Sequence, residues 1–192
     1  MEIRSIKNTK KFRKNKRGQM KMSFGMMFSI FLIAVFLAAA VYFVIQMVDI
    51  GECAKIGKFI DNLQEDVNQI WNSPGDAQKT PPASEYAIPG KVDMVCFYDA
   101  GSPARGKYVD TFPEDLGFYY GKNNNMLFHP EDSGECFESS AVRIKHINAT
   151  EITKNNNPYC FRVSEKDGVS KVGITMSKDS RDTLVCVGED CK

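Results

Sequence analysis

An uninterrupted apolar segment occupies residues 22–48, where only Ser23, Ser29 and Gln46 have strongly polar side chains. A helix rises about 1.5 Å per residue, so this segment would be roughly 40 Å long, against about 30 Å for the hydrocarbon core of a bilayer. A core helix of a soluble protein is rarely apolar around its whole circumference over such a length. The pattern therefore predicts a transmembrane helix, with a buried core helix as the alternative.

A second helical pattern follows the apolar segment directly, in residues 49–73. Its apolar side chains recur at the period of one helix face, with polar residues on the other faces: Ile56, Phe59, Ile60, Leu63, Val67, Ile70 and Trp71. The sequence Asn72-Ser73-Pro74-Gly75 supplies a stop, because proline cannot continue the helix and glycine accepts a positive φ. We expect one helix over about 22–72, whose amphipathic half is covered by the rest of the chain or by a partner helix.

The rest of the chain favours short strands. Residues 74–90 form a proline-rich linker, and residues 91–192 alternate β-rich runs with turn residues. The expected strands are Val92–Tyr98, Phe118–Tyr120, Met126–Phe128, Ala141–Ile147, Tyr159–Val163, Val169–Met176 and Thr183–Val187, with a hairpin turn at Glu165–Gly168. The predicted fold class is α+β: a long N-terminal helix packed on a small antiparallel, β-rich domain.

Charge is sorted along the chain, although the formal net charge is only +1. Residues 1–21 form a basic leader with nine Lys/Arg and one acid, whereas residues 49–192 carry 16 basic and 23 acidic residues. Basic residues stay on the cytoplasmic side of a membrane helix. The predicted localisation is therefore the cell membrane, single-pass, with the N-terminus cytoplasmic and the C-terminal domain outside. The place of the basic run, directly before the apolar segment, explains it as an orientation signal. We therefore do not predict nucleic acid as a partner.

A cleaved secretory signal is the rival interpretation of the apolar segment. Ala38-Ala39-Ala40 resembles a signal-peptidase site. However, Val41–Val48 continues the same hydrophobicity beyond the supposed cut, whereas the apolar region of a signal normally ends after about 7–15 residues. We expect the anchor to be retained.

All six cysteines follow the apolar segment, at Cys53, Cys96, Cys136, Cys160, Cys186 and Cys191. An even number in an exported domain predicts disulfides, although six cysteines allow 15 pairings. Zinc or thiol chemistry is the alternative. It is disfavoured because the sequence has no C-x-x-C and only two histidines, His129 and His146.

No motif for catalysis or for phosphate or dinucleotide binding occurs, and the acidic clusters do not have the spacing of a calcium loop. We therefore predict no catalytic residues, no cofactor, no metal and no enzyme activity. One modification signal is present on the predicted outer side. It is the sequon Asn148-Ala149-Thr150, which makes Asn148 a candidate for N-glycosylation.

Lys16-Arg17-Gly18-Gln19, close before the apolar run, resembles the class III signal peptide of archaeal type IV pilin-like proteins. The resemblance implies cleavage by a prepilin peptidase between Gly18 and Gln19, with the apolar helix kept on the mature subunit. It also implies like subunits and membrane lipid as partners, and a long helix whose outer half packs on a β-rich head. The fifth mature position would be Ser23, where the family usually has an acidic residue that serves assembly.

Three short sequence segments of the β-rich domain are similar to segments of uncharacterised archaeal membrane proteins: Pro103–Tyr108, Ile144–Ile147 and Asn157–Cys160. This similarity implies no activity. The sequence as a whole favours a non-enzymatic single-pass membrane protein with an outward-facing domain, a pilin-like surface or assembly subunit. The alternative is an uncleaved, monomeric anchored ectodomain that binds an envelope partner or a ligand.

Overall fold

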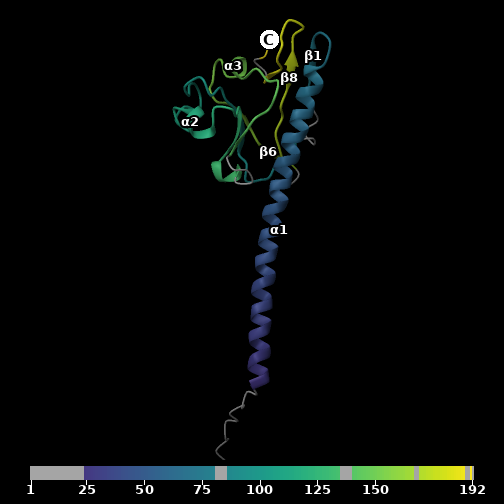
Figure 1. The fold of residues 1–192 in the computed structure, drawn as a ribbon, viewed down its shortest axis with the longest axis vertical. Helices are drawn as coiled ribbons and strands as arrows, with labels where there is room; N and C mark the ends of the chain where they lie inside the picture. The colour runs from purple at the N-terminus through teal and green to yellow at the C-terminus, as the bar shows by residue number, and fades with distance from the viewer. Residues whose placement is uncertain (1–23, 81–85, 135–139, 167–168, 189–190, 192) are drawn as a thin grey trace, which may run out of the picture. The chain divides into compact units, whose positions relative to one another are not determined.

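The computed structural model describes residues 24–80, 86–134, 140–166, 169–188 and 191. The chain divides into two compact units, Met1–Ile45 and Gln46–Lys192, and helix α1 (Phe24–Trp71) contributes to both (Figure 1). We call the second unit the head and describe each unit by itself. The basic leader, including Gly18 and Gln19, lies outside the described residues.

The first unit is, in its described part, the apolar half of α1. Every residue from Phe24 to Ile45 is exposed, including Phe36 at 70%. Among the described residues, α1 is the one helix long and apolar enough to cross a membrane, and none of its most apolar window is buried. The chain's own described residues therefore build no core around this segment.

The described part of the head contains three antiparallel sheets, which confirms the α+β class. The four-stranded sheet has the order β4-β3-β2-β5, the three-stranded sheet has the order β1-β8-β9, and β6 pairs with β7. The strands are β1 (Ala77–Lys79), β2 (Met94–Phe97), β3 (Met126–His129), β4 (Ala141–Val142), β5 (Tyr159–Arg162), β6 (Ser164–Lys166), β7 (Val169–Lys171), β8 (Met176–Lys178) and β9 (Cys186–Val187).

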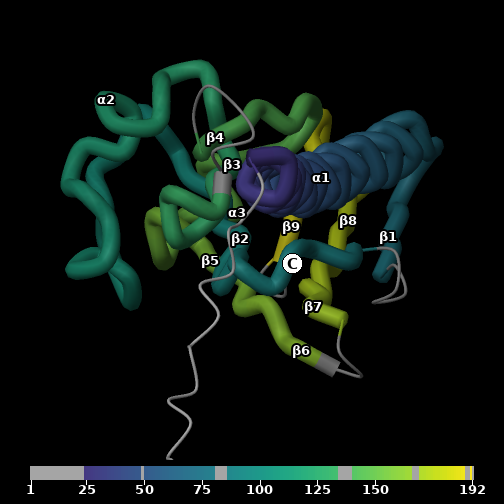
Figure 2. Tube along the Cα trace, turned by 90° about the horizontal axis from the view of Figure 1, so that it is seen from below, coloured from purple at the N-terminus to yellow at the C-terminus, as the bar shows by residue number. Residues whose placement is uncertain are grey.

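The described residues of the head also form three short helical segments: α2 (Leu116–Tyr120), the 3-10 helix η1 (Glu131–Gly134) and α3 (Ala149–Ile152). Both views place α2 on the opposite side of the head from β1 and β8 (Figures 1 and 2). The strands are short, and several are joined by loops rather than by tight hairpins. The packing therefore depends on what covers each face of the sheets.

The four-stranded sheet is buried on both faces. Val95 and Phe97 of β2 belong to the core cluster that contains the α1 residues. Cys96, between them, and Leu127 of β3 belong to a second cluster with Leu116 and Tyr120 of α2. Because alternate side chains of a strand point to opposite faces, this arrangement explains why β2 has no polar alternation.

The amphipathic half of α1 supplies one wall of the main core. Its stripe residues Ile56, Phe59, Leu63, Val67 and Ile70 are at most 3% exposed and share a cluster with residues from both large sheets. Phe59 contacts the rings of Tyr86 and Phe128 edge to face, at centroid distances of 5.6 and 5.9 Å. Burying each such side chain contributes about 1.5–3 kcal/mol.

The expected strand at Phe118–Tyr120 is wrong, because these residues lie in α2. The Asp115 side chain caps the helix by accepting a hydrogen bond from the Phe118 N–H at 2.9 Å. Leu116 and Tyr120, four positions apart, are both buried beneath it, as one helix face requires. Gly117 permits the close packing, since a Cβ there would lie 2.6 Å from the Ala100 carbonyl oxygen.

The expected strand Ala141–Ile147 is also corrected, since β4 ends at Val142. Beyond β4, side chains take over the backbone hydrogen bonds. The Ile144 N–H donates to Asn125 Oδ1 at 2.8 Å, and the Lys145 N–H donates to Gln64 Oε1 of α1 at 2.8 Å. His146 then adopts a positive φ of 65°, which is incompatible with a strand.

The expected strand Val169–Met176 is divided into β7 and β8. Its alternation is real, because Val172, Ile174 and Met176 are all fully buried. The hydrogen-bonding partner changes instead, from β6 on one side of the break to β1 and β9 on the other. The alternation of buried side chains therefore continues from β7 into β8, although the two strands belong to different sheets.

The predicted linker and hairpin turn are corrected in part. Residues 74–90 include β1, which pairs with β8, and an isolated bridge between Ala87 and Lys171. Glu165 and Lys166 belong to β6 rather than to a turn, and the remaining turn residues, 167–168, lie outside the described residues. The helix stop is confirmed, because α1 ends at Trp71 and Gly75 has a φ of 86°.

Candidate functional site

Two disulfides are present in the described part of the head. Cys96 and Cys160 are directly opposite each other on β2 and β5, with their Cα atoms 4.0 Å apart. Cys186 and Cys191 close a short loop at the end of the chain. In the first, Cys96 is fully buried in the cluster that contains α2 residues and Cys160 is partly buried, whereas both partners of the second are partly exposed.

Cys53 of α1 is also disulfide-bonded. Cys96, Cys160, Cys186 and Cys191 pair with one another, and Cys136 lies outside the described residues. Among the described residues there is no free cysteine and no group of three or more residues able to hold a metal ion.

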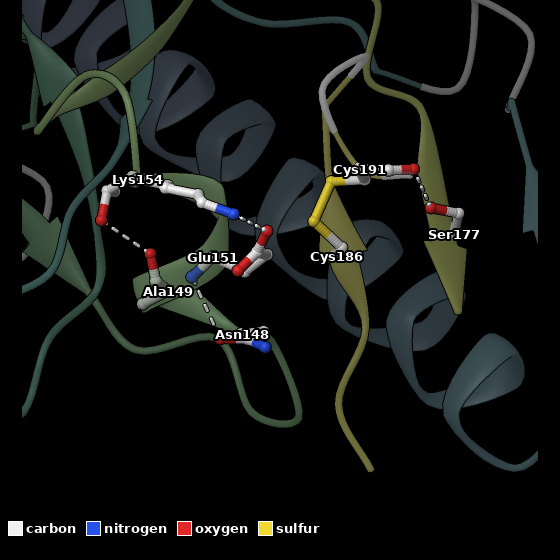
Figure 3. The surroundings of a disulfide bond; sticks show 8 residues. Asn148, Ala149, Glu151, Lys154, Ser177, Cys186 and Cys191 are labelled. Atoms are coloured by element: carbon white, nitrogen blue, oxygen red, sulfur yellow. Dashed lines mark hydrogen bonds and ion pairs between the residues drawn. A yellow bond between two sulfur atoms is a disulfide. The ribbon is translucent and has the colours of Figure 1, made fainter. Parts of the chain in front are cut away.

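A polar groove of about 710 Å³ lies beside the Cys186–Cys191 disulfide, and we call it the C-terminal groove. Residues far apart in the sequence line it: Asp76, Ala77, Gln78, Asn148, Glu151, Ser177, Lys178, Asp179, Arg181, Asp182, Leu184, Cys186 and Cys191. It therefore brings β1, β8, β9 and the start of α3 to one place. Figure 3 shows the disulfide and α3 on its two sides.

The rim of the C-terminal groove carries both signs of charge. Arg181 pairs with Asp179, with Nε 3.1 Å from Oδ1, and this hydrogen bond lowers the pKa of the Asp179 carboxyl. Asp76 accepts a hydrogen bond from the Ser180 N–H at 2.7 Å. By contrast, the side chains of Gln78 and Asp182 make no hydrogen bond to the described part of the chain. These groups can form hydrogen bonds with a polar ligand, Gln78 as donor or acceptor and Asp182 as acceptor.

Asn148, the sequon residue, stands at the edge of this groove. Its Oδ1 accepts a hydrogen bond from the Glu151 N–H at 3.1 Å and so caps α3 (Figure 3). Its own backbone N–H donates to the Val185 carbonyl at 2.8 Å. The side chain is therefore oriented by α3, and the backbone by the segment that leads into β9.

A second exposed feature is the aromatic pair on α2. Phe118 and Tyr119 are 77% and 65% exposed, with their ring centroids 5.5 Å apart. A neighbouring depression of about 720 Å³ is lined mainly by small and charged residues, including Asp115 and Lys122. This surface can contact a partner through its two exposed rings and the charged side chains beside them.

The two histidines occupy structural positions. His146 stacks on Trp71 of α1, with ring centroids 3.8 Å apart and planes inclined by 15°. His129 contacts the ring of Phe112 edge to face at 5.2 Å. Each histidine therefore packs against an aromatic ring. The Trp71 Nε1–H also donates to the Thr183 carbonyl at 2.9 Å, which joins the end of α1 to the segment before β9.

Two buried tyrosines, Tyr98 and Tyr120, have strongly raised pKa values. Burial raises the pKa of the Tyr98 hydroxyl, which donates to the carbonyls of Tyr120 and Gly121 at 3.0 Å each. Burial also raises the pKa of Tyr120, and its 2.6 Å hydrogen bond to Glu131 adds to the shift. Both groups stay protonated near neutral pH, so they act as hydrogen-bond donors that hold α2 to the sheet.

The structure brings Asn148, Cys186 and Cys191 together at one groove, while Cys96 and Cys160 lie elsewhere in the head. The sequence did not predict this groove, because its lining residues are ordinary polar residues in short runs far apart along the chain. The chain matches no protein-family model, and it has no significant match among curated proteins or solved structures.

Proposed function

We propose that this protein is a non-enzymatic, single-pass membrane protein that displays its head outside the cell as a pilin-like surface or assembly subunit. Membrane lipid surrounds the apolar half of α1, a prepilin peptidase removes the basic leader, and like subunits are its partners. Its cell surface is archaeal, as the resemblance of the leader implies.

The observation that carries the proposal is the complete exposure of a long apolar helix segment. Side chains such as Phe31, Phe36 and Phe43 are 63–70% exposed, and in water each would cost about 1.5–3 kcal/mol relative to burial. Monomeric soluble proteins rarely expose a continuous apolar surface of this kind. Lipid, or the apolar helices of neighbouring subunits, removes that cost.

The disulfides of the head support an outward orientation. Disulfides persist in oxidising compartments and are rare in the cytosol, and the described cysteines of the head are all paired. The excess of basic residues before the apolar segment favours the same orientation, because such residues stay cytoplasmic.

The alternative, an uncleaved anchored ectodomain, is favoured by one observation. Ser23 occupies the place where pilin-like subunits usually carry an acidic residue. The head then acts alone through its surface, for which the C-terminal groove and the Phe118–Tyr119 pair are the exposed features.

Mass spectrometry of the N-terminus of the protein, purified from its native membranes, tests the processing step. A start at Gln19 is the expected result, and electron microscopy for filaments follows from it. A retained leader would contradict the pilin-like proposal and leave the anchored ectodomain, whereas a start near Val41 would show an export signal instead of an anchor.

A size substitution within α1 tests assembly. Ala38→Leu keeps the segment apolar, so that insertion is preserved, but it blocks the close helix approach that small residues allow. Ala40→Leu is the matched control, since it lies about 200° around the same helix. Cross-linking in native membranes should give oligomers of the Ala40→Leu variant but not of the Ala38→Leu variant. Equal amounts of oligomer in both variants would contradict packing through the Ala38 face.

A further inference from the structure

Asn148 uses only one of its two side-chain polar atoms in hydrogen bonds to the described residues. Oδ1 is engaged by the cap of α3, through the 3.1 Å hydrogen bond from the Glu151 N–H. Within the described part of the chain, Nδ2 has no hydrogen-bond partner. Figure 3 shows the nitrogen of this amide on the side away from Glu151.

Nδ2 is the atom that carries the sugar in an N-glycosylated asparagine, and the sequon Asn148-Ala149-Thr150 is the pattern that directs it there. The fold is compatible with this modification, because the cap does not use Nδ2. Thr150, the third residue of the sequon, is exposed, and its hydroxyl makes only a long contact of 3.4 Å with Asp99 Oδ2.

We propose that Asn148 carries an N-linked glycan whose first sugars lie in the C-terminal groove and shield the Cys186–Cys191 disulfide. The N-glycosidic bond forms between Nδ2 and the anomeric carbon of a glycan carried on a polyprenyl phosphate or diphosphate. The bond from that carbon to the phosphate oxygen breaks, and the Nδ2 proton leaves with the phosphate. This inference rests on the proposed export of the head.

The groove has suitable chemistry for a saccharide. Its volume is about 710 Å³, and Asn148 is one of its lining residues. The side chains of Gln78 and Asp182 have no hydrogen-bond partner among the described residues, so they can bind sugar hydroxyls. The disulfide Cys186–Cys191 lines the same groove, so that a glycan there would restrict access to its sulfur atoms.

The first test is the intact mass of the protein purified from its native membranes. We expect a mass above that of the processed polypeptide by one or more saccharide units, and peptide mapping should place them on Asn148. Thr150→Ser, which keeps the hydroxyl, should retain the added mass, and Thr150→Ala should lose all of it. An unmodified native protein would overturn the proposal.

The second test measures access to the disulfide. Limited reduction by dithiothreitol, followed by alkylation, should open Cys186–Cys191 severalfold more slowly in the native protein than in the Thr150→Ala variant. The Cys96–Cys160 disulfide, which does not line the groove and whose Cys96 is fully buried, is the internal control and should be unaffected. Equal rates at Cys186–Cys191 would overturn the placement of the glycan in the groove.

A topology measurement separates this inference from the proposed function. In intact cells, a membrane-impermeant amine reagent labels lysines of the head if the head is outside. Labelling without a glycan would overturn the glycosylation proposal alone. Absence of labelling would contradict the exported head itself.

Discussion

At the residue scale, the most informative side chain is Asp66, a carboxylate on the core-facing side of α1 that is only 7% exposed. The Tyr86 hydroxyl donates to its Oδ2 at 2.6 Å, and the Lys79 ammonium of β1 pairs with its Oδ1. Lys79 also donates to Gln69 Oε1 at 2.9 Å. A buried charge with these partners is satisfied, and it fixes β1 and Tyr86 onto the helix.

Replacement of Asp66 tests this role. Asp66→Asn removes the negative charge that balances Lys79, and we expect the free energy of unfolding to fall by about 1.5–3 kcal/mol. Glu65→Gln, one position earlier and exposed, is the matched control and should change it by less than about 0.5 kcal/mol. Urea unfolding followed by fluorescence of Trp71, the single tryptophan, measures both; equal effects would refute the role of Asp66.

At the element scale, the sequence predicts well wherever side-chain period alone decides the structure. The stripe from Ile56 to Ile70 and the apolar run before it predict α1 almost to its last residue. The prediction fails where another part of the chain decides. Asn125 and Gln64 take the backbone bonds of residues 144–145, and Gly117 can close on Ala100 only in the folded head.

The candidate site illustrates the same limit. Asn148 and the cysteines are identifiable from the sequence because their chemistry is local to a motif or a residue type. The groove around them is not, since Asp76 and Asp182 are neighbours only after β1 and β8 have paired. Similarly, six cysteines alone do not reveal that Cys96 and Cys160 face each other in the register of β2 and β5.

Removal of each disulfide tests how the elements are held together. Cys96 and Cys160 are 64 residues apart in sequence and Cys186 and Cys191 only five, so chain entropy predicts losses of about 4 and about 2 kcal/mol respectively. Paired Cys→Ala variants, unfolded in urea with Trp71 as the probe, give the two values. A larger loss at the C-terminal pair would contradict this order.

Peptide mapping under non-reducing conditions checks the connectivity directly. We expect the linked pairs Cys96–Cys160 and Cys186–Cys191, and a disulfide at Cys53. A free thiol at Cys53 would contradict the third expectation.

At the scale of the whole molecule, the head has a core of its own. Among the described residues, the buried hydrophobic side chains begin at Ile56 and continue to Val187, and none of them lies in the unit formed by Met1–Ile45. The residues that stabilise the head are thus separate in sequence from those that we propose to meet lipid. Residue Asp66 and the stripe around it belong entirely to the head.

A truncated chain tests this separation. Residues 46–192, produced in an oxidising compartment, should fold into a soluble monomer with the same disulfides and the same Trp71 fluorescence as the full chain in detergent. The physical reason is that the truncation removes none of the core residues that the structure describes. Aggregation, or a red-shifted tryptophan spectrum, would indicate that the first 45 residues are needed for folding.

The disulfide at Cys53 has a mechanical consequence. Cys53 lies in α1 three residues before Ile56, the first residue of the core, and the Glu52–Lys91 ion pair stands beside it. A pulling force that arrives along α1 from its amino-terminal end therefore reaches a covalent cross-link before it reaches any packed side chain. At Cys53 the force is shared between the two chain segments that the disulfide joins. The helix therefore does not separate from the head turn by turn.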